Sequence, residues 1–586
     1  MHGVCRSEWQ PRGLITGRLG LPALYVAVLA LLAYRMTIGV DLSDESYYVS
    51  FLDGWLKDGL GHGENLEVHQ SAALLVLPAA RLYTWIVGSE RGLVLFLRFI
   101  FLALACAASV CQYRFIRRVR DDTVAWSSAL LVLCFIPFSL PAPSYNTIGM
   151  FGMVAALALF GVAASRMQPA TNGSAAATLS GVAWMVAVIA YPTMAAALLA
   201  LLVLASLAAR DRGERLRLLG YAMICAFFQF CGACLMLAVF GWTRLWQMLR
   251  FTTTGMQNSE STNPKLAESL GLFVIHPAFG TLCLAAAALG IWLLVADRDR
   301  RRGIWPSLLV LAIVLASYAT GPALWFPPND LVVLLALVGL FALRSRGGAE
   351  GQAPVRVIYV TALVGGLMTA ATSDNGIHNF PIGGLAVAAL APAMLVPRGA
   401  PYSVVVAQCG MLVLTAALFC TSAFASIYGE NANPLTARAV RVSDGRFAGL
   451  LTNAQQAAFI EAATAALSER AGRGKTIVVL GRPAGIYLLT EASPMAPSAW
   501  DYWQFHGSLQ PRMNALMEAF YRVPAHRPDV VAVFTDPRTY PLAPWAREML
   551  TDFVVTKQVS VGSWSLAVYE RCRTPACPAP MTSGVP

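Results

Sequence analysis

The chain has 586 residues, of which 57% are hydrophobic and 13% are charged, and its formal net charge at pH 7 is +11. Soluble globular proteins carry about 25% charged residues, so this composition excludes a water-soluble fold. The positive charge does not indicate a nucleic-acid partner, because the arginines lie in short loops between apolar runs, where membrane proteins place them.

Apolar runs long enough to cross a bilayer core about 30 Å thick recur through the first 427 residues. Residues 1–20 hold three arginines and are expected to form a cytoplasmic N-terminus before an uncleaved first helix. About thirteen spans are predicted within a membrane domain at 21–427: 21–40, 93–113, 123–140, 147–166, 176–192, 193–209, 216–241, 271–296, 304–325, 329–344, 356–372, 379–396 and 403–427.

The distribution of arginine orients these spans. With a cytoplasmic N-terminus, the inner loops hold most of the basic residues, including the run RFIRRVR at 114–120, and the outer loops hold few outside 41–92 and 242–270. Residues 71–88 are also apolar enough to span, but a span there would place the basic run at 114–120 outside. We therefore predict that 71–88 is an interfacial helix within the first outer loop, 41–92.

From residue 428 onward the composition is that of a globular domain, and thirteen spans place it outside the cytoplasm. Gly481-Arg-Pro-Ala-Gly485 follows an apolar run and is typical of a strand–helix turn, because the glycine spacing alone is not a phosphate-binding fingerprint. We predict an extracytoplasmic α/β domain at 428–586, in which three segments are typical of strands, the last of them a pair: 476–480, 529–534 and 553–570.

Polar side chains gather at the outer ends of the predicted spans, whereas the inner ends offer mainly arginine. Such a gathering indicates a site that opens to the outer face. Amide and carboxylate groups match pairs of sugar hydroxyls, but each of these residues alone is also a common turn residue. The set comprises Asp41, Asp44 and Glu45 after the first span, His69 later in that loop, Tyr145 and Asn146 after the third span, and Asp374, Asn375 and His378 after the eleventh.

The acids after the first span are the sharpest feature of the sequence. A partly desolvated carboxylate at the membrane boundary can deprotonate an acceptor hydroxyl as a sugar is transferred to it. A second carboxylate can orient the first or bind a divalent cation, so metal dependence stays open. The alternative interpretation is a solvated loop in which Ser43 or Asp44 caps a helix that begins near Tyr47.

The segment Asp41-Leu-Ser-Asp44-Glu45-Ser-Tyr47-Tyr48 resembles the active-site loop of the GT-C superfamily of integral membrane glycosyltransferases. The likeness is to the branch that contains lipid A aminoarabinose transferases and protein O-mannosyltransferases. It extends to the layout of the chain: about thirteen spans, interfacial helices in the first outer loop, and a C-terminal extracytoplasmic α/β domain. As a residue motif, the likeness covers only this loop.

The resemblance makes Asp44 the general base and Glu45 its catalytic neighbour, with Asp41 a less well matched competitor. It also implies a polyprenyl-phosphate-linked sugar as donor, whose phosphate needs cationic partners. Arg98 in the second span is the preferred partner, and snorkelling of its side chain to the interface is the alternative. Further candidates for the donor or the sugar are Arg244, Arg250 and Lys265 in the 242–270 loop, and His69, which stands in His69-Gln70-Ser71 where the family often has His-Pro-Pro.

The sequence thus predicts an inverting-type glycosyltransferase that moves a hexosyl or pentosyl group from polyprenyl phosphate to a glycolipid, polysaccharide or protein in the periplasm. Its expected location is a bacterial inner membrane, with the site and the C-terminal domain facing the periplasm. A transporter or flippase of lipid-linked sugars is an alternative, although such folds pair two halves with broken helices near the midplane. An O-antigen polymerase or ligase is another alternative, although those proteins lack an acidic pair after the first span.

Overall fold

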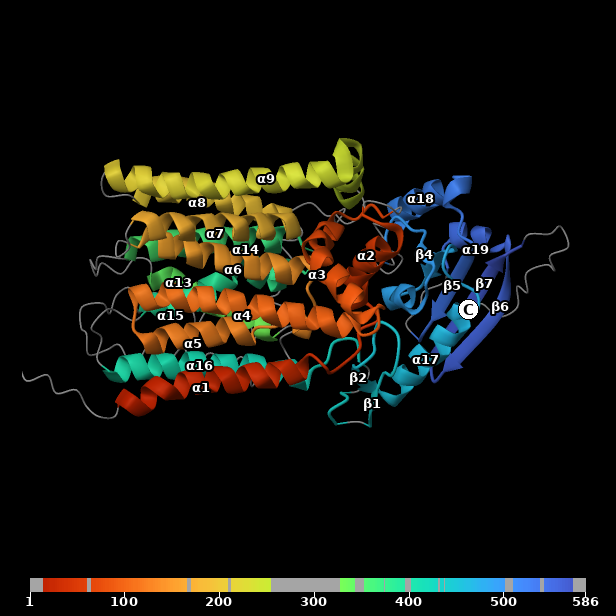
Figure 1. Cartoon of the computed structure of the whole chain (residues 1–586), viewed down its shortest axis with the longest axis horizontal. Coiled ribbons are helices and arrows are strands. Elements are labelled where there is room, and N and C mark those ends of the chain that lie inside the picture. The colour runs from red at the N-terminus through yellow and green to blue at the C-terminus, as the bar shows by residue number, and fades with distance from the viewer. Residues whose placement is uncertain are drawn as a thin grey trace, which may run out of the picture.

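The structure is a computed structural model that describes residues 14–60, 65–165, 170–208, 212–253, 327–342, 352–373, 375–395, 402–430, 433–436, 438–500, 510–537 and 542–572. Its first part is a bundle of apolar helices that run side by side (Figure 1). They are α1 (Leu14–Arg35), α4 (Leu93–Val119), α5 (Asp122–Cys134), α6 (Tyr145–Ala164), α7 (Ala170–Ala190), α8 (Ala195–Ala208), α9 (Arg212–Phe251), α13 (Pro327–Ala342), α14 (Gln352–Ala371), α15 (Phe380–Leu395) and α16 (Tyr402–Ala425).

Small residues let these helices approach closely. Gly365 on α14 and Gly383 on α15 face each other, and a Cβ on Gly365 would lie 3.0 Å from the Gly383 carbonyl oxygen. Close backbone contact of this kind is how helices pack where lipid surrounds them, because burial from water no longer drives their association. Within the described residues, six helices are long and apolar enough to cross a membrane, and further apolar helices are shorter. The chain is therefore a membrane-embedded helical protein.

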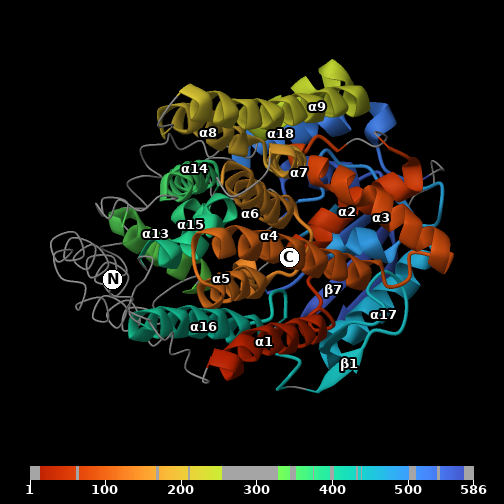
Figure 2. The ribbon, with the colours of Figure 1, turned by 60° about the vertical axis from the view of Figure 1, so that its left-hand side comes forward.

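Two parts of the predicted topology stay predictions. The spans predicted at 271–296 and 304–325 lie outside the described residues, so the count of thirteen is not established. The segment predicted to lie in the interface forms α3 (Ser71–Val87), whose length and composition would also suffice for a span. Both views place α3 beside α2 (Asp44–Asp58), at the end of the bundle that faces the C-terminal domain (Figures 1 and 2).

The C-terminal domain is the α/β unit that the sequence predicts. Its five-stranded sheet has the order β4-β3-β5-β7-β6, in which β3 pairs in parallel with β4 and β5, and β7 pairs antiparallel with β5 and β6. The three predicted strand segments are confirmed as β3 (Thr476–Leu480), β5 (Val530–Thr535) and the pair β6 (Phe553–Val561) and β7 (Trp564–Arg571). The remaining elements are β1 (Ala439–Arg441), β2 (Leu451–Asn453), α17 (Ala454–Ser468), β4 (Ser493–Pro494), α18 (Gln510–Tyr521) and α19 (Pro544–Leu550).

Backbone hydrogen bonds join this domain to the segment between α1 and α2. The Gly485 N–H donates to the Leu42 carbonyl at 2.7 Å, and the Gly39 N–H donates to the Leu451 carbonyl at 2.7 Å. A Cβ on Gly485 would lie 2.8 Å from the Leu42 Cα, so only glycine permits this approach. The glycine spacing after β3 therefore serves the contact between the two domains.

A buried ionic cluster around Arg446 makes a second junction. The Arg446 guanidinium pairs with Asp53 of α2, with Glu90, and with Glu491 of the C-terminal domain at 3.1 Å. Lys57 pairs with the other oxygen of Asp53 at 2.6 Å. Burial alone would raise the pKa of Asp53, but Lys57 and Arg446 outweigh it and hold that pKa below its ordinary value. The cluster therefore binds α2 to the C-terminal domain through charged groups that depend on one another.

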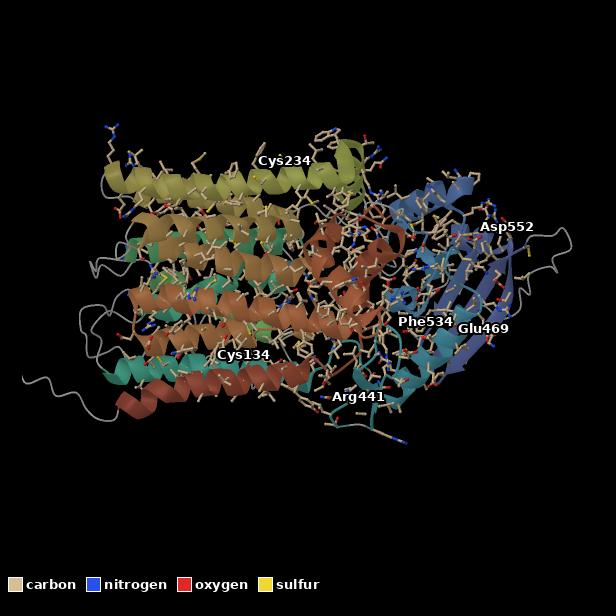
Figure 3. The ribbon with its side chains drawn as sticks, in the orientation of Figure 1. Cys134, Cys234, Arg441, Glu469, Phe534 and Asp552 are labelled. Atoms are coloured by element: carbon tan, nitrogen blue, oxygen red, sulfur yellow. The ribbon has the colours of Figure 1, made fainter. Side chains whose placement is uncertain are left out.

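Replacing Arg446 by methionine should lower the free energy of unfolding by up to about 3–5 kcal/mol, the usual cost of breaking a buried ion pair, because Asp53 keeps only Lys57 and Glu90 loses Arg446. Protease should then release the C-terminal domain at lower concentrations than from wild type, because the junction at Asp53 loses its strongest contact. Arg441 on β1 is exposed and points away from the molecule (Figure 3), so Arg441→Met is the matched control. Equal protease resistance of the two variants would contradict this role for Arg446.

Candidate functional site

The acidic segment, residues 41–45, leads from α1 into α2, and Asp41 starts the helix. One Asp41 carboxylate oxygen accepts from the Ser43 N–H at 2.8 Å and from its hydroxyl at 2.6 Å, and the other accepts from the Glu45 N–H at 2.7 Å. The first N–H groups of a helix lack intrahelical partners, and a carboxylate placed here satisfies them. Asp41, which is 1% exposed, is therefore a capping residue. Because Asp41 also lines a cavity, its role as a competing base or sugar contact stays a prediction.

Glu45 and Arg98, predicted as a catalytic neighbour and a phosphate contact, form a buried ion pair. The Arg98 Nε and Nη2 donate to the two carboxylate oxygens of Glu45 at 2.7 and 2.6 Å, and the side chains are 2% and 1% exposed. Arg98 Nη1 donates to the carbonyls of Met36 and Ile38 at 3.1 and 2.9 Å. With its donors directed at these groups, Arg98 holds the end of α1 against α2 and is not placed to bind a donor phosphate.

Asp44 is the acid of the segment whose carboxylate is only partly occupied by hydrogen bonds. It is only half-buried, and its Oδ2 accepts from the hydroxyl of Tyr428. Its Oδ1 has no hydrogen-bond partner within the described part of the chain. Burial and the nearby negative charge of Asp41 raise the pKa of Asp44 to about 7, against the opposing effects of the Tyr428 hydrogen bond and of Arg482. A carboxylate with this pKa can take up a proton near neutral pH, which suits a general base.

A cavity of about 230 Å³ lies at the acidic segment, where Asp41, Leu42 and Ser43 line it. Its lining includes Ser43, the chain neighbour of Asp44, and Tyr428, its hydrogen-bond partner. Phe534, another lining residue, lies on the side of the C-terminal domain nearer the bundle (Figure 3). The lining therefore comes from the acidic segment, the linker after α16 and the C-terminal domain: Asp41, Leu42, Ser43, Tyr428, Gly429, Glu430, Gln456, Arg482, Pro483, Phe534, Asp536 and Trp564.

His69 and Tyr145 come together, as expected for residues of one outer face. Their rings stack with centroids 3.9 Å apart, and Tyr48 of α2 packs edge-on against Tyr145 at 5.5 Å. Glu67 lies 3.7 Å from the His69 Nδ1. The cavity that these rings help to line has a volume of only about 10 Å³, no more than a water molecule needs. The rings of His69, Tyr145 and Tyr48 are therefore closely packed against one another.

The other predicted contacts lie on α6 and in the turn before α15. Asn146 is buried in the first turn of α6, and its Oδ1 has no partner among the described residues. His378 is buried, and its Nδ1 lies 2.5 Å from the Oδ1 of Asp330 on α13. Asn375 is an exposed turn residue before a short 3₁₀ helix, and Asp374 lies outside the described residues.

Arg250 lies on α9 beyond a kink at Gly241, whose φ is 70°. Its side chain is exposed. A cavity of about 330 Å³ lies at this kink and is lined by Leu66, Phe240, Gly241, Trp242, Thr243, Arg244 and Gln247. Arg244 there donates to the Asn65 carbonyl at 3.2 Å. Arg250 therefore stays a predicted donor contact, and Lys265 lies outside the described residues.

The acidic segment does not fit a divalent cation shared between its carboxylates. The Asp41 oxygens already accept three hydrogen bonds, and both Glu45 oxygens face Arg98. In the part of the chain that the structure describes, no group of three or more His, Cys, Asp or Glu side chains is placed to hold a metal ion. The carboxylates of this segment are therefore not assigned to a metal ion.

No protein-family model and no curated protein matches the sequence. Among solved structures, the chain is similar to ArnT from Cupriavidus metallidurans in the apo state, with a TM-score of 0.45, 14% identity, and coverage of 94% of this chain and 98% of that one. For the same protein bound to undecaprenyl phosphate, the TM-score is 0.41 at 14% identity, covering 96% and 99%. For an oligosaccharyltransferase from Archaeoglobus fulgidus tethered with an acceptor peptide, the TM-score is 0.42 at 12% identity, covering 88% and 69%.

Because every one of these TM-scores is below 0.5, the activity has to be inferred from the chain's own residues.

Proposed function

We propose that this chain is a glycosyltransferase that moves a sugar from a polyprenyl-phosphate-linked donor to an acceptor hydroxyl, with Asp44 as the general base. The observation that carries this proposal is the difference between the three acids of the segment. The carboxylate of Asp41 accepts hydrogen bonds within the segment and that of Glu45 is paired with Arg98. Asp44 keeps one oxygen without a hydrogen-bond partner in the described part of the chain, and its chain neighbour Ser43 and its partner Tyr428 both line a cavity. A cavity outside the helix bundle can admit a polar acceptor, while the bundle itself lies in the lipid that holds the donor's chain.

The chemistry is a single displacement at the anomeric carbon. Asp44 takes the proton from the acceptor hydroxyl, whose oxygen forms a bond to the anomeric carbon as the bond from that carbon to the phosphate oxygen breaks. The phosphate leaves with the electron pair as polyprenyl phosphate. Attack from the face opposite the leaving group inverts the configuration. The other residues that we propose as contacts of the sugar or the phosphate are His69, Tyr145, Asn146, Arg250, Asp374, Asn375 and His378.

The arginine distribution supports an orientation in which this site and the C-terminal domain lie outside the cytoplasm, and we propose that they face the periplasm from a bacterial inner membrane. The acceptor would then be a periplasmic glycan, lipid or protein.

The test is the fate of the sugar–phosphate linkage. Purified protein in nanodiscs is given polyprenyl-phosphate-linked sugar carrying a radiolabel, together with crude acceptor from the envelope. Transfer of label to the acceptor is the expected result, with nucleotide sugar inactive as donor. A flippase would leave the label on the lipid, and that outcome would exclude the proposed activity.

The pH dependence gives a separate prediction. The base must be ionised, and the pKa of Asp44 is about 7, so kcat/KM should rise with pH through that value and level off above it. Below pH 7 we expect about a tenfold loss for each pH unit, because the ionised fraction falls in that proportion. A profile that is flat down to pH 5 would show that this carboxylate does not titrate in the reaction.

A further inference from the structure

We propose that the C-terminal part of the chain completes the catalytic site, with Tyr428 as a positioning residue for Asp44 and Arg482 as its counter-ion. This inference rests on the proposed function of Asp44. It assigns roles to two residues that lie 384 positions or more along the chain from the acid they serve. It also gives the C-terminal domain a part in the reaction.

Tyr428 is held rigidly at the junction. It follows the last described bundle helix, α16, within a linker whose next two residues, Gly429 and Glu430, are anchored by close contacts. Gly429, with φ of 79°, lies so close to Asp41 that a Cβ would stand 2.7 Å from the Asp41 Cα. Glu430 accepts from the Val40 N–H at 2.8 Å and from the Asn453 side-chain amide at 2.7 Å. Tyr428 therefore presents its hydroxyl to Asp44 from a fixed backbone.

Arg482 reaches the same place from the turn after β3. Gly481 before it has φ of 124°, and Pro483 after it is buried. The contact of Gly485 with Leu42 holds this turn against the acidic segment at 2.7 Å. The Arg482 side chain is exposed and lines the cavity. It makes no hydrogen bond or ion pair with any residue that the structure describes, so its charge is available to the site.

The acidic segment needs this cation. The negative charge of Asp41 disfavours ionisation of Asp44, and Arg98 is occupied by Glu45. The groups that face Asp44 are Asp41 and Tyr48 from its own side, Tyr428 from the linker, and Arg482 from the C-terminal domain. Of these, only the Tyr428 hydrogen bond and the Arg482 charge favour the carboxylate form.

Further acids also line the cavity, but they do not replace these two roles. Glu430 is filled by donors from Val40, Thr452 and Asn453. Asp536 lies at the end of β5 and adds negative charge, which would only disfavour ionisation of Asp44. The ionisation of Asp44 therefore depends on the contact that places Tyr428 and Arg482 beside the acidic segment.

The experiment compares the pH profiles of Arg482→Gln, Arg482→Lys and Tyr428→Phe with wild type, using the full-length protein in nanodiscs. In Arg482→Gln the rise of kcat/KM should move to higher pH by about one unit, with recovery at high pH. Arg482→Lys keeps the charge and should retain the wild-type profile. Tyr428→Phe should show the same shift and also a lower kcat at high pH, because the carboxylate loses its orientation.

The controls separate this inference from the proposed function. Arg441→Gln removes an exposed arginine of the same domain and should leave the profile unchanged. If Asp44→Asn is inactive but Arg482→Gln and Tyr428→Phe both keep the wild-type profile, the base assignment survives and the counter-ion and positioning roles are wrong. A rise in KM for Arg482→Gln without any change of profile would likewise overturn the counter-ion role. If Asp44→Asn is fully active, the proposed function itself fails.

Discussion

Asp44→Asn should lower the rate of sugar transfer by about 10²–10⁴-fold, the usual contribution of a general base. An amide has the shape of the carboxylate but cannot take the proton from the acceptor hydroxyl. Folding should be unaffected, because Tyr428 can donate to the amide oxygen and the repulsion between Asp41 and Asp44 disappears. The measurement is kcat for label transfer, alongside the apparent melting temperature and the size-exclusion profile in detergent.

The matched control for this variant is Asp58→Asn, at the far end of the same helix. Asp58 is exposed and accepts from the Ser493 hydroxyl at 2.5 Å, far from the cavity lining. It should keep wild-type kcat. Equal activity of the two variants would show that Asp44 is not the base, whatever the loop resembles.

Arg98→Met should lower the free energy of unfolding by about 3–5 kcal/mol, because it leaves the Glu45 carboxylate buried without its partner. It also removes the donors to the Met36 and Ile38 carbonyls, and buried carbonyls without partners add to the loss. The expected readouts are a lower apparent melting temperature and a smaller yield of monodisperse protein. Activity per folded molecule should fall far less than in Asp44→Asn.

Two further variants test whether the ion pair itself is responsible. Arg81→Met on the neighbouring helix α3 removes an exposed arginine and should be close to neutral. The double variant Arg98→Met with Glu45→Met removes both charges, so it should be more stable than Arg98→Met alone. A double variant as unstable as the sum of its single changes would mean that the two side chains do not depend on each other.

The broad architecture follows from sequence because long apolar runs and alternating strands leave strong local signals. The strand predicted at 476–480 is β3, and the hairpin within 553–570 is β6 and β7. The first acidic helix begins close to where expected, at Asp44, but its cap is Asp41 rather than Ser43 or Asp44. Three acids within five residues are equivalent in a sequence, and only the fold decides which N–H groups each one meets.

The partners of the site were beyond sequence reasoning because they come from far along the chain. Arg98 could be noted as a costly buried charge, but its partner Glu45 could not be told from a phosphate. Tyr428 follows the last span as an ordinary aromatic residue. Arg482 lies between Gly481 and Gly485 in a segment whose glycine spacing predicts only a strand–helix turn. The one feature of the sequence that points to Tyr428 is its position at the outer end of a predicted span, where the other polar candidates also lie.

The most direct test of the central claim is formation of free polyprenyl phosphate from labelled lipid donor in a single turnover, with wild type and Asp44→Asn measured side by side at pH 8. Wild type should release one polyprenyl phosphate for each sugar that appears on the acceptor, and Asp44→Asn should release almost none in the same time. Equal release by both proteins, or movement of the donor across the bilayer with its sugar–phosphate bond intact, would contradict the proposal.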